Sequence, residues 1–200
     1  MASTLEKVAR PDFSNALIHF TRGRAGRRRH FERLDEPENV NQEKVHPLDV
    51  LVEILRDGQL RGSSNAGFIK GDRTAVCFSE VPLSSVRYFI ETKRYSPYGI
   101  AISKKAAFSM GARPVIYLPD AEGEWIPSEE KWRQVRFEHG TVDFTHEREW
   151  RLPGNLNLQK LPGFYLLVWN PTDINCLRDI STKYKNIRGF LPMEHLLDLF

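Results

Sequence analysis

The chain has 200 residues, 40% hydrophobic and 28% charged, with a formal net charge of +3. This composition is typical of a soluble globular protein, and the length favours one domain over residues 1–200 with a core of its own. No apolar run is long enough to cross a bilayer, and Met1 to Arg10 lacks the apolar stretch of a signal peptide. We therefore expect a cytoplasmic protein with no membrane partner. Cys77 and Cys176 have no zinc-type spacing, so we expect free thiols and no metal.

The first half of the chain mixes short strands with short helices. We expect a buried strand over 16–20 and then a flexible, basic, charge-rich loop at about 23–45. Pro47 is expected to begin a helix that ends at Asp57-Gly58. A strand over 74–81, a helix over 84–92 and a strand over 98–103 follow, and Ser103 is placed to cap a helix over 104–111.

The second half is expected to contain strands over 114–118, 149–152 and 164–169. Helices are expected over 125–137 and, as a short amphipathic element, over 191–200. Short strands outnumber helices and do not alternate with them regularly. That pattern favours an α+β fold with a mixed or largely antiparallel sheet over a doubly wound fold.

The segment from Asp143 to Gly154 carries two glutamates two residues apart. If it is extended, Glu147, Glu149 and Arg151 share one face. Two carboxylates beside a cation can act on a centre that develops positive charge. The alternative is a surface strand with ion pairs. A metal site that includes the neighbouring histidine is only weakly supported, because one histidine beside an acid pair is a poor ligand set.

A second polar cluster lies at the end of the first expected strand. Alternation puts His19 and Thr21 on one face, and Arg22 follows. A histidine can hydrogen-bond a ribose hydroxyl, and an arginine can bind a pyrophosphate in a bidentate manner. A lone histidine in a strand is also often structural.

Two further clusters contain aromatic residues. Phe78 and Ser79 end the strand over 74–81, where a hydroxyl can line a cleft or cap the next helix. Tyr98 stands beside Gly99, so its ring could stack on a planar ligand or pack in the core.

Basic residues are concentrated in two places. The expected loop is rich in arginine, which attracts polyanions such as nucleic acid, although a solvated loop without a partner is equally compatible. The stretch from Lys131 to Phe137 interleaves cations with aromatics, as a base-stacking surface or an exposed helix would. The candidate nucleic-acid-binding residues are Arg24, Arg27, Arg28, Arg29, Arg133 and Arg136.

The order of these motifs resembles that of the AbiGi-type abortive-infection proteins of bacteria, which have an ADP-ribosyltransferase-like fold. The beginning of the chain is also loosely similar to that of the DarT toxins. The resemblance is carried by IHFTRG (18–23), VEILRDGQL (52–60), AVCFSEVPL (75–83), YGIAISK (98–104), RPVIYLP (113–119) and EREWRLPG (147–154).

The resemblance implies a split mixed or antiparallel sheet with a cleft for NAD, which is consumed as a substrate. It assigns cofactor contacts to residues at the expected strand ends: His19, Thr21, Arg22, Phe78, Ser79 and, by stacking on nicotinamide, Tyr98. It assigns catalysis to Glu149, assisted by His19, and gives Glu147 the role of guiding the acceptor. The phenylalanine between His19 and Thr21 departs from the small residue often found there.

The activity implied is NAD-dependent ADP-ribosyl transfer to DNA, RNA or protein, in phage defence or a toxin–antitoxin system. AbiGi-type proteins are also described as antitoxins. The alternative is therefore a non-catalytic protein that binds a cognate toxin or a phage component. A third possibility is a nucleic-acid-binding protein that uses only its arginine-rich loop.

Overall fold

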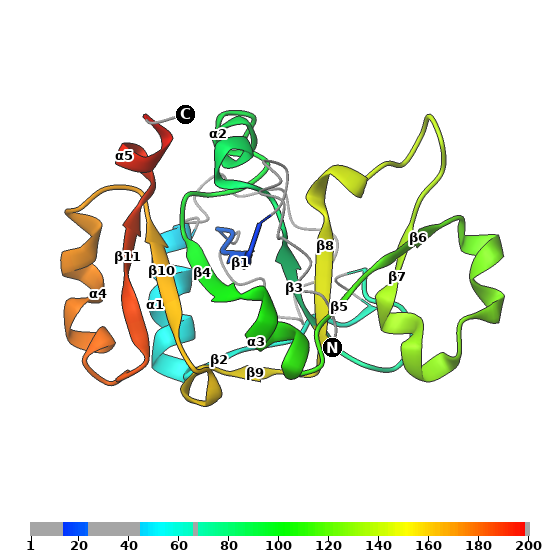
Figure 1. The fold of residues 1–200 in the computed structure, drawn as a ribbon, viewed down its shortest axis with the longest axis horizontal. Helices are drawn as coiled ribbons and strands as arrows, with labels where there is room; N and C mark the ends of the chain where they lie inside the picture. Colours follow the sequence, from blue (N-terminus) through cyan, green and yellow to red (C-terminus); the bar gives the residue numbers. More distant parts are fainter. Residues whose placement is uncertain (1–13, 24–44, 66–67, 199–200) are drawn as a thin grey trace, which may run out of the picture.

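The computed structural model describes residues 14–23, 45–65 and 68–198, and these form an α+β fold built on a seven-stranded mixed sheet (Figure 1). The strand order is β11-β10-β4-β1-β3-β8-β5. The outer pair β10 and β11 is parallel, and the other neighbours in this sheet are antiparallel. The four candidate residues Arg24, Arg27, Arg28 and Arg29 lie outside the described residues, as does most of the expected loop at 23–45.

The seven strands agree closely with the expected ones where a strand was expected, except that the expected strand over 114–118 is divided between an edge strand of the seven and a strand of a small flanking sheet. They are β1 (Ala16–Phe20), β3 (Ala75–Ser79), β4 (Gly99–Ser103), β5 (Arg113–Pro114), β8 (Glu149–Pro153), β10 (Phe164–Val168) and β11 (Ile187–Pro192). Two small sheets flank them, one formed by β2 (Gln59–Leu60) with β9 (Leu156–Asn157) and the other by β6 (Ile116–Leu118) with β7 (Gln134–Arg136).

The local sequence accounts for the helix boundaries. Helix α1 (Pro47–Asp57) begins with proline, has His46 as its N-cap, and ends at Gly58, whose φ of 74° favours a residue without a Cβ. Helix α3 (Lys104–Ser109) is capped by the Ser103 side chain, as expected. The others are α2 (Leu83–Glu91), α4 (Asp173–Ser181) and α5 (Met193–Leu197).

Helices cover both faces of the sheet. On one face, α1 and α4 pack through Leu51, Leu55 and Leu177 in the largest cluster of buried residues. On the other face, α2 and α5 pack through Val86 and Met193. Burial of each such side chain contributes about 1.5–3 kcal/mol relative to exposure, so both layers hold the sheet in place. Figure 1 shows β6 and β7 at the end of the molecule opposite to α4.

Two expectations about helices were wrong. Residues 125–137 do not form one helix but the 3₁₀ segments η2 (Asp120–Trp125) and η3 (Ser128–Arg133), followed by β7. Pro127, which lies between the two 3₁₀ segments, interrupts the backbone hydrogen bonding of a helix. Residues 191–200 were also expected to be helical throughout, but Leu191 and Pro192 belong to β11. Neither α4 nor β11 was expected from the sequence.

Candidate active site

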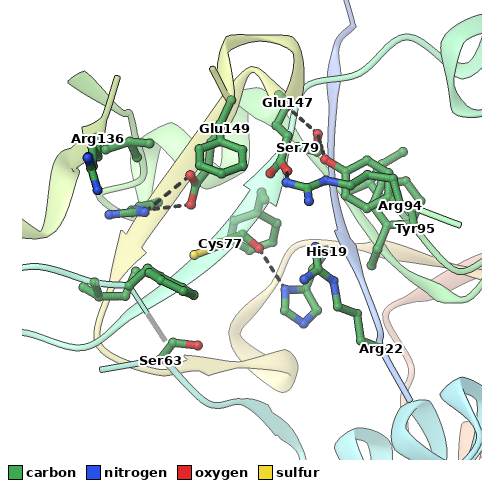
Figure 2. A pocket seen from close by; sticks show the side chains of 18 of the residues that line it. His19, Arg22, Ser63, Cys77, Ser79, Arg94, Tyr95, Arg136, Glu147 and Glu149 are labelled. Atoms are coloured by element: carbon green, nitrogen blue, oxygen red, sulfur yellow. Dashed lines mark hydrogen bonds and ion pairs between the residues drawn. The ribbon is translucent and has the colours of Figure 1, made fainter. Parts of the chain in front are cut away.

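A cleft of about 1060 Å³ opens where β1 and β3 diverge. These strands pair at a single position, Ile18 with Ser79, whereas β1 pairs with β4 at five positions. The volume is at the upper end of the range for small-molecule sites, which suits an elongated ligand. The polar and charged residues of its lining include Arg151. Figure 2 labels others of this lining: His19, Arg22, Cys77, Ser79, Arg94, Arg136, Glu147 and Glu149.

Glu149 is held in the cleft by Arg151, which lies two residues along β8. Antiparallel pairing places Glu149 opposite Ser79 and Arg151 opposite Cys77, so these four side chains share the face of the sheet that forms the cleft wall. The Arg151 guanidinium donates to both Glu149 oxygens, at 2.8 and 3.4 Å. It also donates to the carbonyls of Trp132 and Gln134. The carboxylate therefore has a fixed orientation.

His19 bridges the split in the sheet. Its Nδ1 lies 2.8 Å from the carbonyl oxygen of Cys77. Since a carbonyl only accepts, Nδ1 carries the proton, and Nε2 of the neutral ring is an acceptor. Burial, and to a smaller extent the nearby Arg22, lowers the pKa of His19, although the Cys77 hydrogen bond opposes this shift. His19 can thus accept a hydrogen bond from a ligand hydroxyl at neutral pH.

Glu147 reaches the same cleft but not as part of a strand. It ends the 3₁₀ segment η4 (Thr145–Glu147), and the next residue, Arg148, has a left-handed φ of 47°. The expectation that extended alternation aligns Glu147 with Glu149 was therefore wrong. The Glu147 side chain forms an ion pair with Arg94, and its carbonyl accepts a 2.5 Å hydrogen bond from the Ser79 hydroxyl.

The Cys77 thiol is not suited to nucleophilic chemistry. Burial, followed by the charge of Glu149, raises the pKa of Cys77 to about 12. A thiol needs to be deprotonated in order to attack, so Cys77 remains protonated and unreactive near neutral pH. Chemistry in the cleft then depends on the two glutamates and His19.

The residues expected to contact the cofactor differ in how far their side chains are available to a ligand in the cleft. Phe78 is buried, lines the cleft and makes an edge contact with His19 at 6.0 Å between ring centroids. Arg22 is exposed at the cleft edge, where it could meet a phosphate. Thr21 is buried, and its hydroxyl donates to the carbonyl of Pro47 and, more weakly, to that of Tyr98. Its side chain therefore tethers the backbone, although the residue also lines the cleft.

Tyr98 is not part of the cleft lining, so the structure does not place its ring for stacking on a ligand there. The side chain is buried, its hydroxyl donates to Asp173 at 3.1 Å, and its ring contacts His46. Tyr95, three residues earlier, lines the cleft instead, with its ring stacked on Phe20 at 4.4 Å. The aromatic–glycine pattern pointed to Tyr98, which is next to Gly99, and so selected the wrong tyrosine.

Arg133 and Arg136, the candidate nucleic-acid-binding residues that the structure describes, differ in their position relative to the cleft. Arg136 lines the cleft and pairs with Glu138 at 2.9 Å. Arg133 does not line it; its guanidinium pairs with Glu130 and donates to the carbonyl of Pro114. Sequence reasoning missed Arg94 and Phe68, which both line the cleft. No sequence pattern marks either residue as a candidate, because only the fold brings their side chains to the cleft.

Within the described ranges, no group of three or more histidine, cysteine or acidic side chains is arranged to hold a metal ion. Over the same ranges, no helix has the length and apolar character needed to cross a membrane.

Comparison of the chain with protein-family models, curated proteins and solved structures gave no match.

Proposed function

We propose that the protein is an NAD-dependent ADP-ribosyltransferase, acting in phage defence or a toxin–antitoxin setting as its AbiGi-like motifs imply. The observation that carries the proposal is the convergence of Glu149, Glu147 and neutral His19 on one cleft at the split of the sheet. His19 is far from the two glutamates in the sequence. A split sheet with a late glutamate in its cleft is the arrangement that the resemblance implies.

The chemistry requires a fixed negative charge. When the bond between ribose and nicotinamide breaks, its electron pair leaves with nicotinamide and positive charge develops on the ribose. A carboxylate held near that charge stabilises the transition state more than the ground state, and loss of one such preorganised group costs about 3–4 kcal/mol of barrier. Glu149 fits this role because Arg151 prevents the carboxylate from rotating away.

The other cleft residues supply binding and proton transfer. The Nε2 atom of His19 would accept a hydrogen bond from a ribose hydroxyl, and Arg22 would contact the pyrophosphate. Glu147 would accept the proton of the attacking acceptor group while the new bond to the ribose forms. In this scheme Glu149 acts on the NAD side of the reaction and Glu147 on the acceptor side.

The test is release of nicotinamide from NAD by the purified protein, followed by chromatography, together with NAD binding by calorimetry. Glu149→Gln should lower nicotinamide release by at least about a hundredfold, the usual effect of removing a preorganised charge. Glu91→Gln is the matched control, because Glu91 is exposed on α2, is outside the cleft lining and pairs with Arg87, which is also outside it. Equal activities of the two variants would contradict the proposal.

A specific observation supports a second, non-catalytic candidate function. Both glutamates of the cleft are already paired with arginines, Glu149 with Arg151 and Glu147 with Arg94. In this second function each arginine would neutralise the carboxylate charge instead of orienting it towards the ribose, so the site would bind NAD without hydrolysing it, and the protein would act as an antitoxin or a sensor. NAD binding with unchanged NAD after prolonged incubation, with or without DNA, RNA and lysate, would favour this function.

A further inference from the structure

A second pocket of about 470 Å³ adjoins the cleft. The two cavities share three lining residues, Arg22, Arg94 and Tyr95, so one ligand could extend through both. The second pocket is formed by the end of β1, the end of α2 and the connection that leads to β4. Its complete lining is Arg22, Gly23, Pro47, Ile90, Lys93, Arg94, Tyr95, Ser96 and Pro97.

The charges of this second pocket are all of one sign. Arg22, Lys93 and Arg94 line it, and none of its nine lining residues is acidic. Arg94 separates the two cavities: one of its Nη atoms pairs with Glu147 in the cleft, while its Nε is buried without a hydrogen-bond partner among the described residues. A buried donor without an acceptor is unfavourable, and an anionic ligand could provide the missing acceptor.

The uncharged part of the lining indicates which anion fits. Ile90, Pro97 and the Tyr95 ring add apolar surface beside the cations. The volume exceeds that of a phosphate group alone. A nucleotide combines a phosphate with a flat apolar base, and it can enter a concave pocket only when it is not base-paired.

We propose that this second pocket binds a nucleotide of a single-stranded nucleic acid, with its phosphate on Arg22, Lys93 and Arg94. The acceptor role of that strand rests on the proposed transferase function. Because Arg94 contacts both the pocket and Glu147, the neighbouring nucleotide would lie beside the carboxylate assigned to the acceptor side. The arginine-rich stretch of the sequence begins at the residue after Gly23, so further cations follow directly along the chain.

The test is binding of a fluorescently labelled single-stranded oligonucleotide by the full chain, without NAD, over a series of salt concentrations. Lys93 is the informative residue because it lines only the second pocket. Lys93→Gln should weaken binding and lower the log–log salt slope by about 0.7–1, the contribution of one phosphate contact. Lys105→Gln, on the exposed surface of α3 and outside both cavities, is the matched control.

Folding of the variant is checked separately. Lys93 has a left-handed φ of 58°, which asparagine tolerates well, so Lys93→Asn should keep the melting temperature and show the same loss of affinity. Two results would overturn the proposal: a salt slope for the Lys93 variants equal to that of Lys105→Gln, or competition by polyglutamate of equal charge as strong as by the oligonucleotide. Absence of nicotinamide release would count only against the transferase function, because this binding assay contains no NAD.

Discussion

Arg151 binds both carboxylate oxygens of Glu149, and its own side chain is 4% exposed. The two residues are separated by one position on β8, so their side chains extend from the same face of the strand. The carbonyls of Trp132 and Gln134 fix the other side of the guanidinium. Arg151 therefore connects Glu149, the proposed catalytic carboxylate, to the segment that leads into β7.

Replacing this arginine should affect both stability and activity. Arg151→Gln leaves the Glu149 carboxylate without its counter-charge in a largely buried position, and breaking such a pair costs about 3–5 kcal/mol. Arg136→Gln, which breaks the exposed pair with Glu138, should cost less than about 1 kcal/mol. Denaturant unfolding of the two variants measures the contrast. Similar free energies of unfolding would show that the Glu149–Arg151 pair is not structural.

Glu147→Gln is expected to separate the two halves of the reaction. The change keeps a hydrogen-bonding side chain near Arg94 but removes the base assigned to the acceptor. Nicotinamide release in water should fall by less than about threefold, while transfer to an acceptor should fall by about 10²–10⁴-fold, the usual contribution of a general base. Both rates are read from one reaction with labelled NAD. If nicotinamide release falls as far as in Glu149→Gln, the roles of the two glutamates are assigned wrongly.

Tyr98→Phe tests the placement of the two tyrosines. Loss of the hydroxyl that donates to Asp173 should lower the free energy of unfolding by about 1–2 kcal/mol, because the bond is partly buried and made to a carboxylate. NAD affinity should not change, since Tyr98 is outside the cleft lining. Tyr95→Leu should instead weaken NAD binding. Calorimetric titration and thermal unfolding of both variants provide the comparison.

The neutral state of His19 predicts a pH dependence of stability. Burial lowers the pKa of His19 below its ordinary 6.5, so the unfolded chain takes up a proton first as the pH falls. The contribution of His19 to stability is therefore complete above 6.5 and is lost as the pH falls towards the lowered folded value. His19→Asn can still donate to Cys77 but does not titrate. The difference in free energy of unfolding between wild type and variant should change between about pH 7.5 and about pH 5. A constant difference over that interval would contradict the assignment.

Phe68 has a backbone conformation that is rare for a bulky residue, and its aromatic side chain is exposed to solvent. Its φ is 67°, a region that bulky residues rarely adopt, and its side chain is 89% exposed although it lines the cleft. Strain at an exposed aromatic suggests selection for ligand contact. Phe68→Ala and Phe68→Gly should weaken NAD binding equally. Only the glycine variant relieves the strain, so it should be more stable than the alanine variant by about 1 kcal/mol. Equal melting temperatures would contradict this account.

Local sequence determined most of the regular elements. The Pro47 start and Gly58 end of α1, the Ser103 cap of α3 and the β1 strand follow from nearest-neighbour chemistry, and the structure has them where they were expected. The failures occurred where tertiary contacts outweigh local preference. Residues 125–137 form 3₁₀ turns and a strand because Pro127 cannot continue a helix and because β7 pairs with β6, a contact that the local sequence does not reveal.

The order of the motifs, through the resemblance, also assigned His19, Tyr98, Glu147 and Glu149 to one cleft. Only the tertiary structure decided which neighbours complete the cleft. Tyr95 lines the cleft and Tyr98 does not, although only two residues separate them. The Tyr98 hydroxyl bonds instead to Asp173 on α4, a helix that the sequence pattern did not reveal. Arg94 acquires its role from an ion pair with the distant Glu147, which depends on the tertiary structure and cannot be read from spacing. Alternation along the strand had already placed Arg151 beside Glu149, but its burial and its bonds to the carbonyls of Trp132 and Gln134 come only from the fold.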